Sequence, residues 1–197
     1  MKHLFIAPFI FLILLSINAC SSLGGSSDST HFYSLSALSE SSTSTPSLLK
    51  LGIGPVRLQR QLKRPQIVSR INQNELHVDE AHQWAGSLKE DITQVLVDNL
   101  SGLLGTEQIE KFPWKSHFRP DYQVRVQVER FDGEPGKEVV LKARWWLRQH
   151  HDSYDKLAKK SVIRVAMQRT DYNSYVAALS KALDTLSREI ARSIRHQ

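Results

Sequence analysis

The chain has 197 residues, 26 of them lysine or arginine against 20 aspartate or glutamate, and a single cysteine. This length suits one domain with its own core, and one thiol excludes an intrachain disulfide framework. A net charge of +6 is compatible with nucleic acid, but no RNA-binding or zinc-finger pattern is present and the first residues indicate export, so we expect no nucleic-acid partner.

The first residues read as a secretory signal. Lys2 supplies a positive charge, an apolar run follows, and Ala19 is a small residue directly before Cys20. The run is shorter than the roughly 20 apolar residues that a membrane span needs. Residues 17–20 resemble the bacterial lipobox, whose cysteine is acylated. We therefore predict a signal peptide over residues 1–19 and lipidation of Cys20, with palmitate as one acyl group; an ordinary signal peptide with an incidental cysteine is the alternative.

A Gly/Ser-rich segment follows the cysteine, and we predict that residues 20–30 form a flexible lipidated tether. The residue after the cysteine is Ser21 and not aspartate. By resemblance to lipoproteins of two-membrane bacteria, this favours the outer membrane, with the protein body facing the periplasm. The basic excess that remains favours anionic lipid head groups, or is simply a solvated face.

Short apolar patterns with a period of two predict a series of strands. Pro55 lies inside the second of them and indicates a sheet edge or a bulge. The free edge of this strand could pair with another copy of the chain or with another protein. The predicted strands are residues 31–38, 48–58, 66–70, 75–78, 108–112, 122–131, 138–150 and 161–166.

Two longer segments carry apolar residues on one face at helical spacing. The first is predicted to begin near Asp79, as its cap, and to end near Leu104. The second runs from Tyr172 to Ile194, with Asp171 as its cap. Strands with one polar face and helices with one apolar face predict an α+β fold over residues 31–197. We expect a two-layer sandwich in which both long amphipathic helices pack on one face of a mostly antiparallel sheet.

Polar residues around the predicted fourth strand could suggest a metal site. His77, Glu80 and His82 have a spacing that matches no zinc pattern, so a solvated polar edge is the better interpretation. The sequence has no Gly-x-Ser-x-Gly elbow and no glycine-rich phosphate loop. We therefore expect no metal, no cofactor and no catalytic residue.

Two adjacent tryptophans lie on the predicted strand 138–150, so their rings point to opposite faces. One is expected in the core. Trp146, on the face shared with Arg144 and Arg148, is a candidate anchor for a partner or lipid, or an aromatic ring packed beside arginine stems.

Several short motifs together resemble one protein family. They are Ile53-Gly54-Pro55-Val56, Arg64-Pro65-Gln66-Ile67-Val68-Ser69-Arg70, Trp84-Ala85 and Phe112-Pro113-Trp114. They resemble the ABC-type transport auxiliary lipoproteins, the family that includes paraquat-inducible protein C, from about Tyr33 to Ile194. Within them, Arg64, Gln66, Arg70 and Trp84 are candidate partner-binding residues; the first three could instead hold a turn by hydrogen bonds.

The resemblance implies a non-enzymatic periplasmic component of a lipid transport system that maintains envelope integrity. Its partner would be a transporter subunit with MCE domains, which form rings or tubes between the two membranes. A collar for such a partner would be a homo-oligomer, with a ring as one arrangement, and phospholipid would be a further ligand. One alternative is a periplasmic lipid carrier, which needs a cavity of about 300–1,000 Å³ between helices and sheet. A periplasmic hydrolase is a further alternative.

Overall fold

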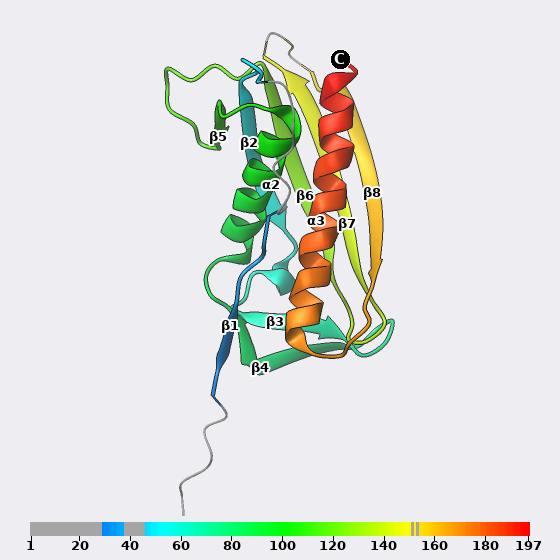
Figure 1. Ribbon diagram of the computed structural model, residues 1–197. Helices are drawn as coiled ribbons and strands as arrows, with labels where there is room; N and C mark the ends of the chain where they lie inside the picture. Colours follow the sequence, from blue (N-terminus) through cyan, green and yellow to red (C-terminus); the bar gives the residue numbers. More distant parts are fainter. Residues whose placement is uncertain (1–28, 38–45, 151, 153) are drawn as a thin grey trace, which may run out of the picture.

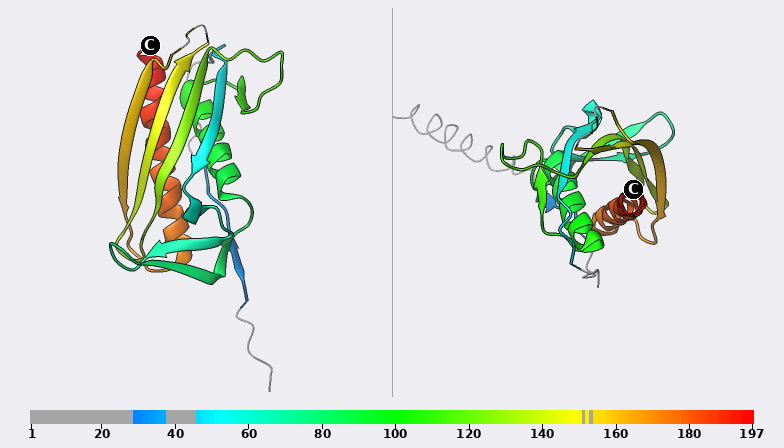
Figure 2. Two further views of the ribbon diagram at one scale, coloured as in Figure 1. Left: turned by 180° about the vertical axis from the view of Figure 1, so that it is seen from behind. Right: turned by 90° about the horizontal axis from the view of Figure 1, so that it is seen from above.

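The computed structural model describes residues 29–37, 46–150, 152 and 154–197. Two long helices, α2 (Leu88–Leu104) and α3 (Tyr172–Arg195), lie side by side on one face of a five-stranded sheet (Figure 1). Seen from behind, the sheet covers both helices (Figure 2). The predicted signal peptide, Cys20 and nearly all of the predicted tether lie outside the described residues.

The five-stranded sheet has the order β5-β2-β6-β7-β8. Strands β6, β7 and β8 form an antiparallel meander, whereas β2 is parallel to both β5 and β6. The chain between β2 and β6 includes β3, β4 and α2, which gives the long crossover that a parallel pair requires. The bounds are β2 (Leu51–Leu58), β5 (Ile109–Lys111), β6 (Tyr122–Glu134), β7 (Glu138–Gln149) and β8 (Leu157–Ala166).

A second, three-stranded sheet has the order β1-β4-β3 and lies across the end of the molecule where α3 begins (Figure 1). Its strands are β1 (His31–Tyr33), β4 (Leu76–Trp84) and β3 (Gln66–Arg70); β3 is antiparallel to β4, and β1 is parallel to it. The short 3-10 helix η2 (Arg60–Leu62) connects β2 to β3. The first described residues lie at this end of the molecule, and the C-terminus lies at the opposite end (Figure 1).

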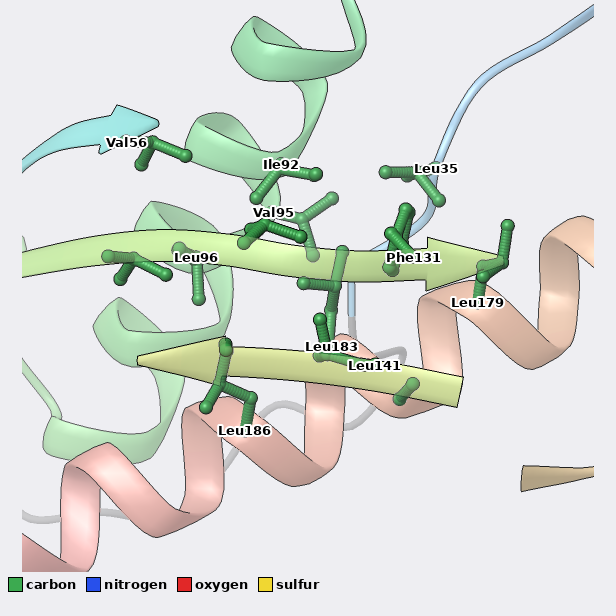
Figure 3. Packing of buried hydrophobic residues seen from close by; sticks show 14 of the residues in the cluster. Leu35, Val56, Ile92, Val95, Leu96, Phe131, Leu141, Leu179, Leu183 and Leu186 are labelled. Atoms are coloured by element: carbon green, nitrogen blue, oxygen red, sulfur yellow. The ribbon is translucent and has the colours of Figure 1, made fainter. Parts of the chain in front are cut away.

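The core fills the layer between the two helices and the five-stranded sheet. Leu96 of α2, Leu183 of α3 and Leu141 of β7 are fully buried there and point into the same layer (Figure 3). Trp145 of β7 is also fully buried, and its indole N–H donates to Ser161 Oγ at 3.0 Å. Burying such side chains contributes about 1.5–3 kcal/mol each, so this layer is the main source of stability.

The predicted α+β sandwich with both helices on one face is confirmed. The strands do not form one antiparallel meander; they divide into two mixed sheets. Helix α3 begins where it was predicted, since Asp171 Oδ1 accepts a hydrogen bond from the Ser174 N–H at 2.9 Å. Of the sheet edge or bulge predicted at Pro55, a bulge is present, as the β2–β6 register shifts between Ile53 and Val56.

The predicted start of the first helix was wrong. Asp79 lies in β4, and the helix begins at Leu88. Asp79 does accept hydrogen bonds as a cap would, from the N–H groups of Ala81 at 2.9 Å and His82 at 3.1 Å. These bonds hold a bulge, because the β3–β4 register jumps between Gln66 and Ile67. The strand then continues as far as Trp84, which was expected near a helix start.

Candidate partner-binding cleft

A cleft of about 1030 Å³ lies between the second half of β2 and the beginning of α2. On the β2 side it is lined by residues 53–58, and on the α2 side by residues 86–90 and Thr93. The cleft is also lined by Gln59, the segment 62–65, Gln127 of β6 and residues 111–113 at and after the end of β5. The crossover from β2 to β6 thus brings several separate segments together around the cleft.

The rim of the cleft is basic. Five exposed cations surround it against one exposed carboxylate, Glu90, whose Oε1 lies 3.4 Å from Lys89 Nζ. The Nζ of Lys111 donates to Gln94 Oε1 at 3.0 Å. Such an excess favours an anionic occupant. The five cations are Arg57, Lys63, Arg64, Lys89 and Lys111.

The apolar residues of the cleft are mostly part of the core. Ile53, Val56, Leu62 and Leu88 are buried, so they present little surface to the cleft. Phe112, directly after β5, is half exposed, and Pro65 and Pro113 are also exposed. The cleft thus combines a lining of mixed polarity with a basic rim.

The outer face of the five-stranded sheet carries a second basic surface around Trp146. Trp146 lies opposite Arg125 in the β6–β7 register, with the Arg125 guanidinium 5.5 Å from the ring centre. Asp155 pairs with Arg125 and with Arg148, the latter at 3.3 Å. A hollow of about 310 Å³ beside Trp146 is also lined by Arg57, so this surface adjoins the cleft. The ring is half-buried beside the Arg125 guanidinium and remains accessible.

The family-like motif is divided between the surface and the interior. Arg64 is exposed and lines the cleft. Gln66 Nε2 donates to Glu80 Oε2 at 2.9 Å, which ties β3 to the bulge of β4. Arg64 is therefore the member of this pair that a partner could reach.

Arg70 is engaged within the molecule. Its Nε and Nη2 each donate to the Asp132 carboxylate at 3.0 Å, and its Nη1 donates to the Gln73 carbonyl oxygen at 2.8 Å. Trp84 is only 5% exposed. Its backbone N–H donates to the Pro65 carbonyl oxygen at 2.7 Å, which fixes the segment that bears Arg64. Trp84 thus supports the cleft through the backbone of Pro65, whereas Arg70 joins β3 to β6 away from the cleft lining.

The histidines of β4 gather around Asp79. His82 Nδ1 lies 3.1 Å from one carboxylate oxygen, His77 Nε2 lies 3.6 Å from the other, and the Tyr172 hydroxyl donates to the carboxylate at 2.8 Å. Burial raises the pKa of Asp79, but hydrogen bonds from His82, Tyr172 and the Ala81 N–H outweigh it and bring the pKa to about 2. Among the described residues, no group of three His, Cys, Asp or Glu side chains is placed to hold a metal.

Sequence reasoning missed the cleft itself. Lys63 and Lys89 were not singled out, because nothing in the local sequence shows that the segment after β2 faces the start of α2. Arg64 was found through its motif, and the free edge of β2 was anticipated. The short predicted strand over residues 108–112 could have linked Arg64 to this edge, because a short β5 leaves part of β2 without a neighbouring strand.

The sequence matches the family described as the ABC-type transport auxiliary lipoprotein component over residues 33–191. The match spans most of the chain, so this protein belongs to that family of transport-associated lipoproteins. A search of the curated proteins finds no match. Neither helix of the described residues combines the length and hydropathy that a membrane span requires.

Solved structures share the fold. One uncharacterized protein matches with a TM-score of 0.71 and 21% identity, covering 84% of this chain and 99% of its own. Protein XCC0632 from Xanthomonas campestris matches with a TM-score of 0.69 and 17% identity, covering 82% of this chain and 93% of its own. At these identities the likeness concerns the fold alone.

Proposed function

We propose that this protein is an outer-membrane-anchored periplasmic lipoprotein that serves an MCE-type ABC lipid transport system without catalysing a reaction. The observation that carries the proposal is the family match over residues 33–191, joined to the lipobox-like sequence that ends at Cys20. Two or three acyl chains would hold the protein at the membrane, because each buried methylene contributes about 0.8 kcal/mol. In this role it would help phospholipid pass between the membranes and so maintain envelope integrity.

The orientation of the folded domain suits a lipoprotein that is anchored at one end. The first described residues lie at the end of the three-stranded sheet, and the C-terminus lies at the far end of α3 (Figure 1). An acyl anchor at Cys20 would therefore hold the three-stranded sheet near the bilayer. The other end, with the C-terminus, would face the periplasm, and an MCE-domain subunit would reach the folded domain from that compartment. A homo-oligomer, such as a ring, would match the symmetry of that partner.

The alternative of a lipid carrier is less well supported. It needs a cavity between the helices and the sheet, and in that layer Leu96, Leu183 and Trp145 are fully buried. The open cleft lies instead at the edge of the sheet and has a basic rim. This arrangement favours the docking of a partner over the storage of an acyl chain.

The proposal is tested in envelope fractions. The mature N-terminal peptide should have the mass of an acylated Cys20, and the protein should sediment with the outer membrane. The Cys20→Ser variant should fold but no longer be bound to membranes. The Ser21→Asp variant should remain acylated and be found in the inner membrane. An MCE-domain subunit should co-purify with the wild type. A freely diffusing protein with an unmodified thiol, or envelope preparations without that subunit, would refute the proposal.

A further inference from the structure

Strand β2 has an unpaired edge along the second half of its length. β5 pairs with β2 only at Leu51–Ile53, and the last contact is the Phe112 N–H donating to the Ile53 carbonyl oxygen at 2.8 Å. On its other side, β2 stays paired with β6 as far as Leu58. Within the part of the chain that the structure describes, no strand pairs with the β5 side of residues 54–58. A free edge of this kind is a template for one more strand.

Phe112 lies close to Gly54, and beyond this point the edge borders the cleft. The cleft of about 1030 Å³ separates residues 54–58 from the opposite wall at residues 86–90. A further strand would lie about 4.7–4.9 Å from β2. The volume is enough for a short extended peptide, so strand addition requires no opening of the core.

The charges around this edge select the occupant. Arg57, Lys63 and Arg64 are exposed and have no ion-pair partner among the residues described. The N-terminus of α2 adds positive partial charge, since the Ser87 side chain makes no capping hydrogen bond to the helix. An occupant with carboxylates would be attracted by the three cations and by the helix N-terminus. An occupant with basic residues would be repelled.

An acyl chain suits the cleft less well than a peptide. The exposed apolar residues of the lining lie beside cations: Pro65 directly follows Arg64, and Phe112 directly follows Lys111. A hydrocarbon chain that covered them would also remove charged groups from water. The free edge of β2 can instead form main-chain hydrogen bonds, which give affinity in strand addition; Pro55 has no N–H, so it would take part through its carbonyl oxygen alone. Backbone edge and basic rim together describe a site for an extended acidic segment.

We propose that this cleft binds an extended, acidic segment of a partner protein, which adds a strand to the free edge of β2 at residues 54–58. The proposal rests on the docking function proposed above and names the chemistry of the docked segment. Acidic side chains of the segment would meet Arg57, Lys63 and Arg64, and its backbone would continue the five-stranded sheet.

The test uses the mature lipoprotein in detergent micelles and a random library of ten-residue peptides. We expect the bound peptides to be enriched in Asp and Glu alternating with apolar residues. The strongest peptide should bind at least tenfold more weakly to Arg57→Glu/Arg64→Glu. The control Lys50→Glu/Arg192→Glu reverses two exposed cations outside the cleft and should leave the affinity unchanged. The same peptide should slow amide exchange in residues 54–58.

Two modified peptides separate strand addition from charge attraction and leave the protein untouched. N-methylation of alternate backbone nitrogens, or replacement of each Glu by Lys, should reduce binding at least tenfold. No acidic enrichment, equal binding to both double variants, or unchanged amide exchange would overturn the proposal. Protection of residues 54–58 by phosphatidylglycerol vesicles without peptide enrichment would overturn it and assign the cleft to anionic lipid. An unacylated Cys20 would refute the anchoring function and leave these peptide results standing.

Discussion

The hydroxyl of Tyr175 donates a hydrogen bond to the backbone carbonyl oxygen of Val68 at 2.9 Å. The hydroxyl oxygen in turn accepts a hydrogen bond from the Gly133 N–H, also at 2.9 Å. Tyr175 belongs to α3, Val68 to β3 and Gly133 to β6, so one buried hydroxyl joins the helix to both sheets. Burial raises the pKa of Tyr175, which keeps the hydroxyl protonated as a donor.

Removal of this hydroxyl should weaken the junction between the sheets. Tyr175→Phe leaves the Val68 carbonyl and the Gly133 N–H without their partner in a buried place. We expect the free energy of unfolding to fall by about 1–3 kcal/mol, measured by urea denaturation. Tyr154→Phe, at a residue that is 69% exposed, is the control and should change it by less than about 0.5 kcal/mol. Equal effects of the two variants would contradict the structural role of Tyr175.

The carboxylate of Asp132 is a second internal junction. It is only 2% exposed and pairs with Arg70 Nε at 3.0 Å and with Arg130 Nε at 2.7 Å. Asp132→Asn removes the charge and leaves two guanidinium groups together, so we expect a loss of about 3 kcal/mol in unfolding free energy. Glu75→Gln, on the exposed turn after β3, is the surface control. If Asp132→Asn proved as stable as that control, Arg70 would again become a candidate for contact with a partner.

Glycine has different roles at two positions. A Cβ atom at Gly133 would lie 2.1 Å from the Glu138 carbonyl oxygen, whereas one at Gly102 in α2 would meet nothing within 4 Å. Gly133→Ala should therefore force the β6 and β7 backbones apart and cost about 1–3 kcal/mol. Gly102→Ala should stabilise the protein by up to about 1 kcal/mol through helix propensity. The two thermal midpoints should move in opposite directions, and a parallel shift would argue against this close approach.

Periodicity predicted what depends on local pattern. The stripe of α3 with its Asp171 cap, and the alternation that places Trp145 inside, follow from the spacing of apolar residues along one element. The start of α2 does not follow from local spacing, because an aspartate that resembles a helix cap can accept the same hydrogen bonds in a strand bulge. Asp79 accepts hydrogen bonds from nearby downstream N–H groups in either case, and only the pairing of β4 with β3 decides between them.

The site was less predictable than the fold. Arg64, Lys89 and Lys111 lie on three segments far apart in sequence, and only the parallel crossover of β2 and β6 places them around one cleft. Their proximity is a property of topology, which local periodicity does not encode. Trp84 illustrates the converse, since a residue singled out by its motif lies in the core and acts through the backbone of Pro65.

Asp79 makes the stability of the three-stranded sheet depend on pH. Its pKa is lowered from 3.8 to about 2 in the folded protein. A lowered carboxyl pKa contributes stability above pH 3.8, and this contribution is lost as the pH falls towards 2. The shift corresponds to about 2 kcal/mol.

The acid dependence can be measured by urea denaturation between pH 6 and pH 2. Asp79→Asn should be less stable than the wild type by about 2 kcal/mol at pH 6, and the difference should shrink between about pH 4 and pH 2. Tyr172→Phe keeps the carboxylate but removes its 2.8 Å hydrogen bond, so it should show a smaller part of the same effect. A difference between Asp79→Asn and wild type that stays constant down to pH 2 would mean that the carboxylate gains nothing from the groups around it in the fold.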